Sequence, residues 1–297
     1  MQTAEATPVR LAAPGRRPGP LRRAIRELAL VAVLFGAYKL GRLAVVGRAG
    51  TAVANGEFVW HLERLLRLPS EVALQHPVLS AELLARLANS YYAYVHFPAT
   101  IGCLLWLYLR RPAHYRWTRR GLAALTAAAL ALHLLVPLAP PRLTPLTGMV
   151  DTGSRYGPAV YGPPGTDEVS NQYAAMPSLH VGWAIAVGVA LVATTAGRRR
   201  WLWLAHPIVT ALVVVVTGNH YWLDGIVATA MLAIVLMLLP APADGDRPSG
   251  RSWGCPRGRP DRPPGSTRCR VGAPAGGWRR ARERRRVVRG AAATRRR

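Results

Sequence analysis

Six long apolar runs alternate with polar, charged connections along the chain. They cover approximately residues 28–46, 92–109, 122–138, 179–196, 201–217 and 221–240. Each run is close to the ~20 apolar residues that an α-helix needs to cross a hydrocarbon core of about 30 Å. Backbone polar groups must be satisfied internally in lipid, and a helix does this within one segment. The pattern therefore predicts an all-α fold, a polytopic bundle of six transmembrane helices.

A different helical pattern lies between the first two runs. In residues 56–75, the apolar side chains of Phe58, Leu62, Leu65 and Leu66 recur at helical spacing among charged residues. Such a segment is typical of an amphipathic helix that lies at the membrane interface. A packed structural helix fits the pattern equally well, and we assign this segment no chemistry.

The charge of the chain is unevenly distributed. The 297 residues include 39 Lys and Arg against 14 Asp and Glu, and residues 245–297 alone hold 17 Arg and three acids. That tail is rich in Pro and Gly and has few large aliphatic residues, so we expect it to be disordered. The charge therefore does not indicate a specific nucleic-acid partner. The expected organisation is a basic arm (1–24), a membrane domain (25–241) and a cytoplasmic tail (242–297).

Basic residues also separate the connections into two groups. The N-terminal arm, residues 110–120, residues 198–200 and the tail are strongly basic, whereas residues 48–90 and 139–176 are nearly balanced. By the positive-inside rule, both termini are cytoplasmic and the chain is a multi-pass protein of the cell membrane. The connections that end at the fourth and sixth runs then lie on the extracytoplasmic side.

Two polar islands sit at the outer starts of the fourth and sixth runs. In "HYWLD", His220 and Asp224 are four residues apart and share a helix face, so the carboxylate can fix the imidazole tautomer and leave the other nitrogen free. In "MPSLH", Pro177, Ser178 and Leu179 begin a helix, with Pro177 expected in its first turn, and His180 follows. A helix N-terminus suits an anion, so these islands indicate phosphoryl transfer through a phosphohistidine.

A guanidinium completes the expected phosphate site. Arg142 follows two prolines at the outer end of the third run, where it can hold phosphate oxygens through forked hydrogen bonds or act only as an interfacial anchor. We also expect Asn219, the residue before His220, to bind substrate. Weaker candidates in the loop before Ser178 are Asp151, expected to cap or brace the loop, Asn171, expected to form a turn, Arg155 and Gln172.

Other interpretations of these residues stay open. The lone histidines His96, His133 and His206 are interpreted as core or pore-lining residues. His180, His220 and Asp224 could instead bind a divalent metal as part of a metal-dependent hydrolase. A non-catalytic transporter or scaffold could use the same histidines as a proton relay.

Together, "MPSLH" and "HYWLD" resemble the type 2 phosphatidic acid phosphatase superfamily, which also includes the vanadium haloperoxidases, and in particular its inositol phosphorylceramide synthase-like branch. The resemblance implies that His220 attacks phosphorus, Asp224 orients it, His180 protonates the leaving oxygen, and Ser178 with its neighbouring backbone binds phosphate.

Two motifs depart from the family pattern. The first motif, a lysine followed by Arg-Pro, is absent, and "PPR" ending at Arg142 resembles its shortened replacement in the synthase-like branch. Val213 and Val214 stand where the family usually has Ser-Arg.

The expected function is a membrane phosphoryl-transfer enzyme that acts on a lipid phosphate. Water or an alcohol acceptor would take the phosphoryl group from His220, so hydrolysis and head-group transfer both stay open. The expected mechanism requires no metal or cofactor, because histidine and arginine side chains carry the charges. Nothing in the sequence indicates an oligomeric state.

Overall fold

The computed structural model describes residues 20–45, 47–162 and 171–242, and these form helices and turns without a β-strand. The all-α prediction is confirmed for this part of the chain. The helices are α1 (Pro20–Val45), α2 (Ala49–Leu65), α3 (Glu71–Leu79), α4 (Glu82–Tyr94), α5 (His96–Arg110), α6 (Pro112–Leu135), α7 (Thr152–Tyr156), α8 (Leu179–Thr194), α9 (Ala205–Val216) and α10 (Trp222–Leu238), with short 3-10 helices η1 (Pro141–Leu143), η2 (Pro145–Thr147) and η3 (Arg198–Leu204).

Every predicted run is mainly helical, although run 92–109 crosses the break between α4 and α5 and run 201–217 begins in η3. Six membrane crossings are not confirmed. Among the described residues, one continuous helical stretch, Arg198–Val216, is long and apolar enough to cross a bilayer. The pair α4 and α5 adds a second candidate if both helices count as one span, bent by 41°. Apolar α8 and α10 have 16 and 17 residues. Six crossings therefore stay a prediction.

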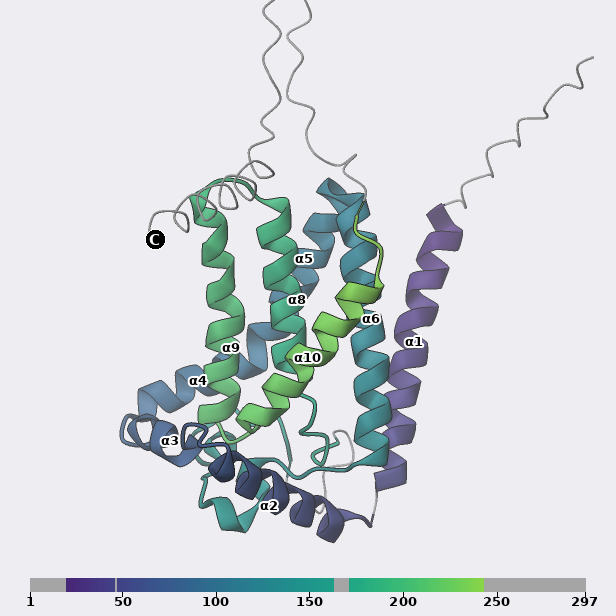
Figure 1. Cartoon of the computed structure of the whole chain (residues 1–297). Helices are drawn as coiled ribbons and strands as arrows, with labels where there is room; N and C mark the ends of the chain where they lie inside the picture. The colour runs from purple at the N-terminus through teal and green to yellow at the C-terminus, as the bar shows by residue number, and fades with distance from the viewer. Residues whose placement is uncertain (1–19, 46, 163–170, 243–297) are drawn as a thin grey trace, which may run out of the picture. The chain divides into compact units, whose positions relative to one another are not determined.

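The segment predicted as one amphipathic helix forms two helices. Its chain turns between α2 and α3, where Arg67 adopts a positive φ of 57° and Pro69 cannot continue a hydrogen-bonded helix. Ser70 then caps α3 by accepting a hydrogen bond from Ala73 N at 3.3 Å. Helix α2 lies across one end of the bundle (Figure 1), with Ala52, Gly56, Val59 and Glu63 on its buried face.

Helix α8 is the centre of the bundle and contacts α5, α6, α9 and α10. Small residues allow this close packing, because Ala184 and Ala190 are fully buried. A Cβ added at Gly182 would lie 2.7 Å from Leu125 Cδ2, so the glycine lets the Leu125 side chain of α6 pack directly against the α8 backbone. Because α8 carries His180 in its first turn, the packing fixes that histidine relative to the other helices.

The loops that lead into α8 and α10 lie at the end of the bundle that α2 crosses (Figure 1). One isolated parallel bridge joins the start and the end of the connection between α6 and α8, with Leu138 N donating to Tyr173 O at 2.8 Å and Ala175 N donating to Leu138 O at 3.2 Å. The tail and most of the basic arm fall outside the described residues.

Candidate active site

His220 is held in one tautomer by two oxygen acceptors. Its Nδ1 lies 2.9 Å from Ala175 O and 3.2 Å from Asp224 Oδ2. A carbonyl oxygen can only accept a hydrogen bond, so Nδ1 carries the proton in the neutral ring. The Nε2 lone pair is consequently available to attack an electrophile. Asp224 is fully buried and also accepts from Tyr221 N at 2.9 Å, which caps α10 and ties the carboxylate to the helix start.

A tight turn between α9 and α10 presents His220. Gly218 has a φ of 73°, which favours glycine, and a Cβ there would lie 3.1 Å from Arg142 Cβ. The backbone N–H groups of Asn219 and His220 both donate to Val214 O, at 3.0 and 3.1 Å. The turn therefore brings His220 to the bundle end while its backbone stays close to Arg142.

His180 lies beside His220, as the prediction requires. Their ring centroids are 6.0 Å apart. Tyr92 stacks on His180 with centroids 4.5 Å apart, and His96 packs against it at 4.7 Å. Two aromatic neighbours from α4 and α5 thus fix the plane of the His180 ring.

The predicted helix start differs in detail from the observed one. Ser178 is the N-cap of α8 and accepts from Val181 N at 3.3 Å, so Pro177 precedes the cap and is not in the first turn. The prediction of Pro177 as a first-turn residue is wrong, because the buried Ser178 hydroxyl provides the cap. Leu179, the first helical residue, packs its side chain into the core beside Leu122 and Leu125.

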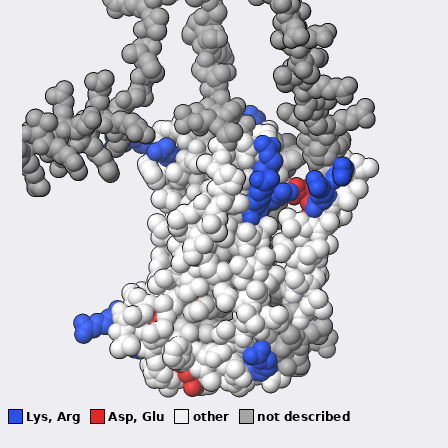
Figure 2. Space-filling model, turned by 45° about the vertical axis from the view of Figure 1, so that its right-hand side comes forward, with Lys and Arg blue, Asp and Glu red and all other residues white. Residues whose placement is uncertain are grey.

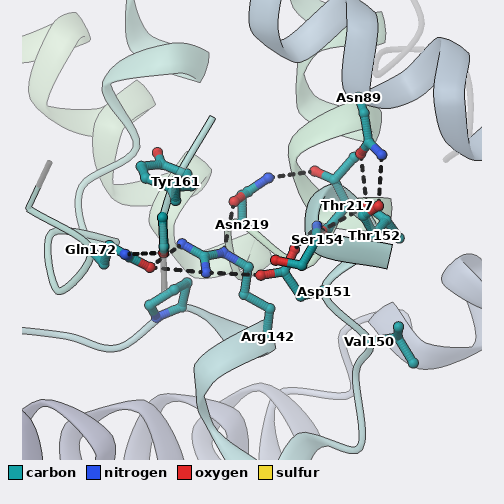
Figure 3. Close-up of polar contacts among 12 residues, drawn as sticks. Asn89, Arg142, Val150, Asp151, Thr152, Ser154, Tyr161, Gln172, Thr217 and Asn219 are labelled. Carbon is teal, nitrogen blue, oxygen red and sulfur yellow. Dashed lines mark hydrogen bonds and ion pairs between the residues drawn. The ribbon is translucent and has the colours of Figure 1, made fainter. Parts of the chain in front are cut away.

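Arg142 is at the centre of a polar network (Figure 3). Its Nε donates to Asn219 Oδ1 at 3.0 Å, and its two Nη groups donate to Asp151 Oδ2 and Gln172 Oε1, each at 3.2 Å. The guanidinium also lies 4.6 Å from the centroid of the Tyr161 ring. The side chain is only 3% exposed, so its orientation is fixed by packing as well as by hydrogen bonds.

The Arg142 network continues to the histidines. Asn219 is the residue before His220, and Arg142 N donates to Gly218 O at 2.9 Å. On the other side, the Tyr161 hydroxyl lies 2.6 Å from the Tyr92 hydroxyl, and Tyr92 stacks on His180. The predicted components, two imidazoles and one guanidinium, are thus at the same end of the bundle and linked by shared contacts.

The two valines that replace the family's Ser-Arg pair are core residues. Val213 and Val214 pack with Tyr92 and Val181 in one buried apolar cluster. Val214 is 1% exposed. This position therefore supplies apolar packing behind the turn, and Arg142 is the cation that the described residues bring to the site.

Several residues near the site were assigned no functional role from the sequence. His133 Nε2 lies 3.2 Å from Pro177 O, and His96 packs against His180, although both histidines were interpreted as core or pore-lining residues. Both are buried. Tyr92 and Tyr161 were not candidates at all, because neither an aromatic residue in an apolar run, such as Tyr92, nor one in a loop, such as Tyr161, gives a signal of its partner.

Of the weaker candidates, Asp151 does cap and brace its loop. Its Oδ1 accepts from Ser154 N at 3.0 Å at the start of α7, and its Oδ2 pairs with Arg142. Asn171 forms the expected turn by accepting from Tyr173 N at 3.2 Å. Gln172 holds Arg142, whereas Arg155 is exposed and lies over its neighbour Tyr156.

The alternative of a metal centre finds no support in the described part of the chain. No group of three or more His, Cys, Asp or Glu side chains there is arranged to hold a metal ion. Asp224 Oδ2 is already engaged by His220 Nδ1 and by Tyr221 N.

Comparison with known families agrees with this arrangement. The family model of the PAP2 superfamily matches residues 57–238, more than half of the chain and a range that contains every residue of the site. Comparisons with curated proteins and with solved structures find no match. The match does not separate the inositol phosphorylceramide synthase-like branch from the rest of the superfamily. The chain belongs to the PAP2 superfamily, the type 2 phosphatidic acid phosphatase superfamily, and this membership supports phosphatase-type phosphoryl transfer in general.

Proposed function

We propose that the protein is an integral membrane enzyme that transfers the phosphoryl group of a lipid phosphate through a phosphohistidine on His220. Membership of the superfamily supports phosphatase-type phosphoryl transfer in general. The main support for a phosphohistidine on His220 is that Ala175 O and Asp224 both contact its Nδ1. These contacts leave Nε2 as the nucleophile.

In the first step, the Nε2 lone pair forms a bond to phosphorus while the bond from phosphorus to the leaving oxygen breaks. The imidazole becomes positively charged, and Asp224 stabilises that charge through the Nδ1 hydrogen bond. His180, which becomes protonated beside the negatively charged bound phosphate, gives this proton to the leaving oxygen. The product is a neutral lipid alcohol and a phosphorylated His220.

In the second step, an acceptor hydroxyl attacks the phosphohistidine and His220 Nε2 is released. Neutral His180 takes the proton of the acceptor, which restores its starting form for the next cycle. With a phosphomonoester substrate, water as the acceptor gives inorganic phosphate. With a phosphodiester substrate, His220 carries the phosphate together with its head group, and an alcohol acceptor receives both. The resemblance of "PPR" to the synthase-like branch is the reason to test both acceptors.

Arg142 supplies the positive charge for the phosphoryl oxygens. Its contacts within the described residues use four of the five guanidinium N–H groups, and three of these contacts are to neutral amide oxygens of Asn219 and Gln172. A phosphate oxygen can take the remaining Nη2 hydrogen or replace a neutral acceptor. Asn219 holds the guanidinium toward the His220 turn, and the α8 start that Ser178 caps adds the partial charge of a helix N-terminus.

The distribution of exposed apolar surface supports membrane integration. The apolar side chains of Leu28, Ile101, Ile208 and Met237, on four different helices, are each at least half exposed. In Figure 2, charged side chains gather toward the two ends of the visible face and leave an uncharged band between them. Such a large exposed apolar surface is unfavourable in water and favourable in lipid.

An apolar cavity supports a substrate with a hydrocarbon chain. It has a volume of about 470 Å³ and lies between α5, α8 and α9, lined by residues that include Gly102, Val187, Trp203 and His206. The His206 ring is 6.2 Å from that of His96, which in turn contacts His180. One wall of the cavity is therefore separated from His180 by two ring contacts.

The positive-inside rule supports a site on the extracytoplasmic side of the cell membrane, with both termini cytoplasmic. The basic connections of residues 110–120 and 198–200 follow α5 and α8, whose other ends are near the site. The proposed partners are the membrane itself and a lipid phosphate, without a specific nucleic acid.

The test is a panel of lipid phosphates incubated with the purified full-length protein in mixed micelles. We expect release of inorganic phosphate, or transfer of a head group when an alcohol such as inositol or a diacylglycerol is present. EDTA should leave the rate unchanged, because His220 and Arg142 carry the charges. Loss of activity with EDTA, restored by a divalent ion, would exclude this mechanism.

A further inference from the structure

Two glutamates are buried beside the start of α10. Glu63 on α2 is fully buried, and Glu71, the first residue of α3, is 2% exposed. Arg64 Nη2 lies 2.8 Å from Glu71 Oε2 but 3.8 Å from Glu63 Oε2. One cation thus faces two carboxyl groups and is hydrogen-bonded to Glu71. Burial of a second, unpaired carboxylate would be costly.

The remaining oxygens of this pair indicate a shared proton. As carboxylates, Glu63 Oε2 and Glu71 Oε1 have no hydrogen-bond partner in the described part of the chain, although both are buried. Burial, followed by the hydrogen bond to Glu71, raises the pKa of Glu63 to about 9. At neutral pH, Glu63 is therefore the protonated member, and Glu71 is the charged member that pairs with Arg64.

Glu63 also contacts the helix that carries Asp224. Its Oε1 accepts a hydrogen bond from Leu223 N at 2.7 Å, one residue before Asp224. The adjacent Trp222 Nε1 donates to Pro69 O at 3.0 Å, in the turn between α2 and α3. The first turn of α10 is thus held from outside the bundle by the segment that contains both glutamates.

We propose that Glu63, as the neutral member of a proton-sharing pair with Glu71, is a positioning residue for His220 and Asp224. This inference rests on the proposed function. A neutral Glu63 holds the Leu223 N–H without placing another negative charge beside Asp224. The titratable and charged groups that face Glu63 are Arg64 on α2, Glu71 on α3, and Tyr221 and Asp224 at the start of α10. Of these, Arg64 is engaged with Glu71, so ionised Glu63 would repel Asp224.

Glu63→Gln tests the protonation state, because its amide can accept from Leu223 N and donate to Glu71. Glu71→Gln is the converse variant: its amide donates to Glu63 and makes Glu63 the charged member. We expect E63Q to keep kcat at pH 7 within about threefold of the wild-type value. E71Q should lower kcat by about tenfold or more, the factor that corresponds to a free-energy difference of one pKa unit. Glu82→Gln is the matched control, because Glu82 is an exposed carboxylate on α4.

The pH profile is the decisive readout. In the wild type, kcat should fall as the pH rises through about 9, where Glu63 ionises, and E63Q should lack that fall. An alkaline fall of equal size and midpoint in the wild type and E63Q would overturn the proposal. So would inactivity of E63Q with its folding intact.

Thermal unfolding in detergent tests the Glu63–Glu71 pair independently of enzyme activity. Burial raises the folded-state pKa of Glu63, so its stabilisation is complete below the ordinary pKa of 4.5 and is lost as the pH rises through about 9. The wild type should lose thermal stability across this range relative to E63Q. Equal pH dependence of the two proteins would overturn the proposal. If wild-type protein turns over no lipid phosphate, the proposed function fails, and this profile still decides the state of the pair.

Discussion

At the residue scale, a backbone carbonyl decides the chemistry of His220. The spacing of His220 and Asp224 predicts their hydrogen bond, which the structure has at 3.2 Å. The shorter contact, 2.9 Å, is to Ala175 O, which lies 45 residues earlier in the chain. Because that carbonyl accepts only, it maintains the Nδ1–H tautomer even when Asp224 is engaged with Tyr221 N.

Arg142→Lys tests the role of the guanidinium. Lysine keeps the positive charge but cannot keep the planar set of contacts to Asn219, Asp151 and Gln172. We expect kcat/KM for a lipid phosphate to fall by about 10²–10³-fold, the usual effect of removing one preorganised donor to the transition state. The measurement is phosphate release by purified protein.

Arg155→Lys is the control for this substitution, because Arg155 is on the same loop, exposed, and stacked on Tyr156. It should retain wild-type activity. Equal activity of the Arg142 and Arg155 variants would contradict the assignment of Arg142 as the phosphate-binding cation.

The side chains that hold Arg142 show the limit of prediction at this scale. Arg142 was predicted from its position after two prolines, and Asp151 from its turn-forming context. That Gln172 and the ring of Tyr161 also hold the guanidinium could not be predicted, because these residues lie 30 and 19 positions after Arg142, in a connection whose described residues are largely loop. Periodicity carries no information on pairing within such loops.

At the element scale, Ser178 has a structural role at the N-terminus of α8. Its hydroxyl is fully buried and caps the helix at Val181 N. Ser178 N donates in turn to Asp224 O at 3.0 Å, so the starts of α8 and α10 are directly joined. The two histidine islands are therefore one structural unit. Contact between Ser178 and phosphate stays a prediction.

Ser178→Ala separates helix capping by this serine from its predicted contact with phosphate. Loss of the cap should lower the free energy of unfolding by about 0.5–2 kcal/mol. Because the hydroxyl is buried, kcat/KM should change by less than about tenfold, well below the 10²-fold expected for a donor to the transition state. The measurements are thermal unfolding in detergent and phosphate release. A larger loss of activity without loss of stability would show that Ser178 binds phosphate.

The elements themselves were well predicted where the chain is apolar. Each of the six runs is helical, because apolar residues in succession favour a segment that satisfies its own hydrogen bonds. The break between α2 and α3 was missed even though Pro69 and Ser70 mark it, since the apolar spacing around Leu62, Leu65 and Leu66 continues almost to the break. Periodicity reports which face is apolar and is insensitive to a local change of direction.

At the scale of the whole molecule, the candidate site and the most basic connections are at opposite ends. The site lies where α8 and α10 begin, and the basic connections lie where α5 and α8 end. With the uncharged band in Figure 2, this arrangement favours a membrane protein whose site faces away from the cytoplasm.

Labelling with a membrane-impermeant maleimide tests this topology. Single cysteines at the exposed positions Ser154 and Arg199 would be introduced after replacement of Cys103, Cys255 and Cys269 by serine. We expect Ser154→Cys to be labelled on intact cells, and Arg199→Cys to be labelled only after the membrane is opened. The reverse pattern would place the site on the cytoplasmic side, and labelling of both on intact cells would contradict a sealed membrane domain.

The central claim, that His220 carries the phosphoryl group, is tested most directly by trapping that intermediate. Purified protein would be mixed with a ³²P-labelled lipid phosphate, quenched in alkali, which preserves phosphohistidine, and mapped by peptide mass spectrometry. The account predicts that His220 alone carries the label. The label should be absent from His220→Ala and should stay on His220 in the control His76→Ala, in which an exposed histidine is replaced. Label on another residue, or substrate turnover by His220→Ala, would contradict it.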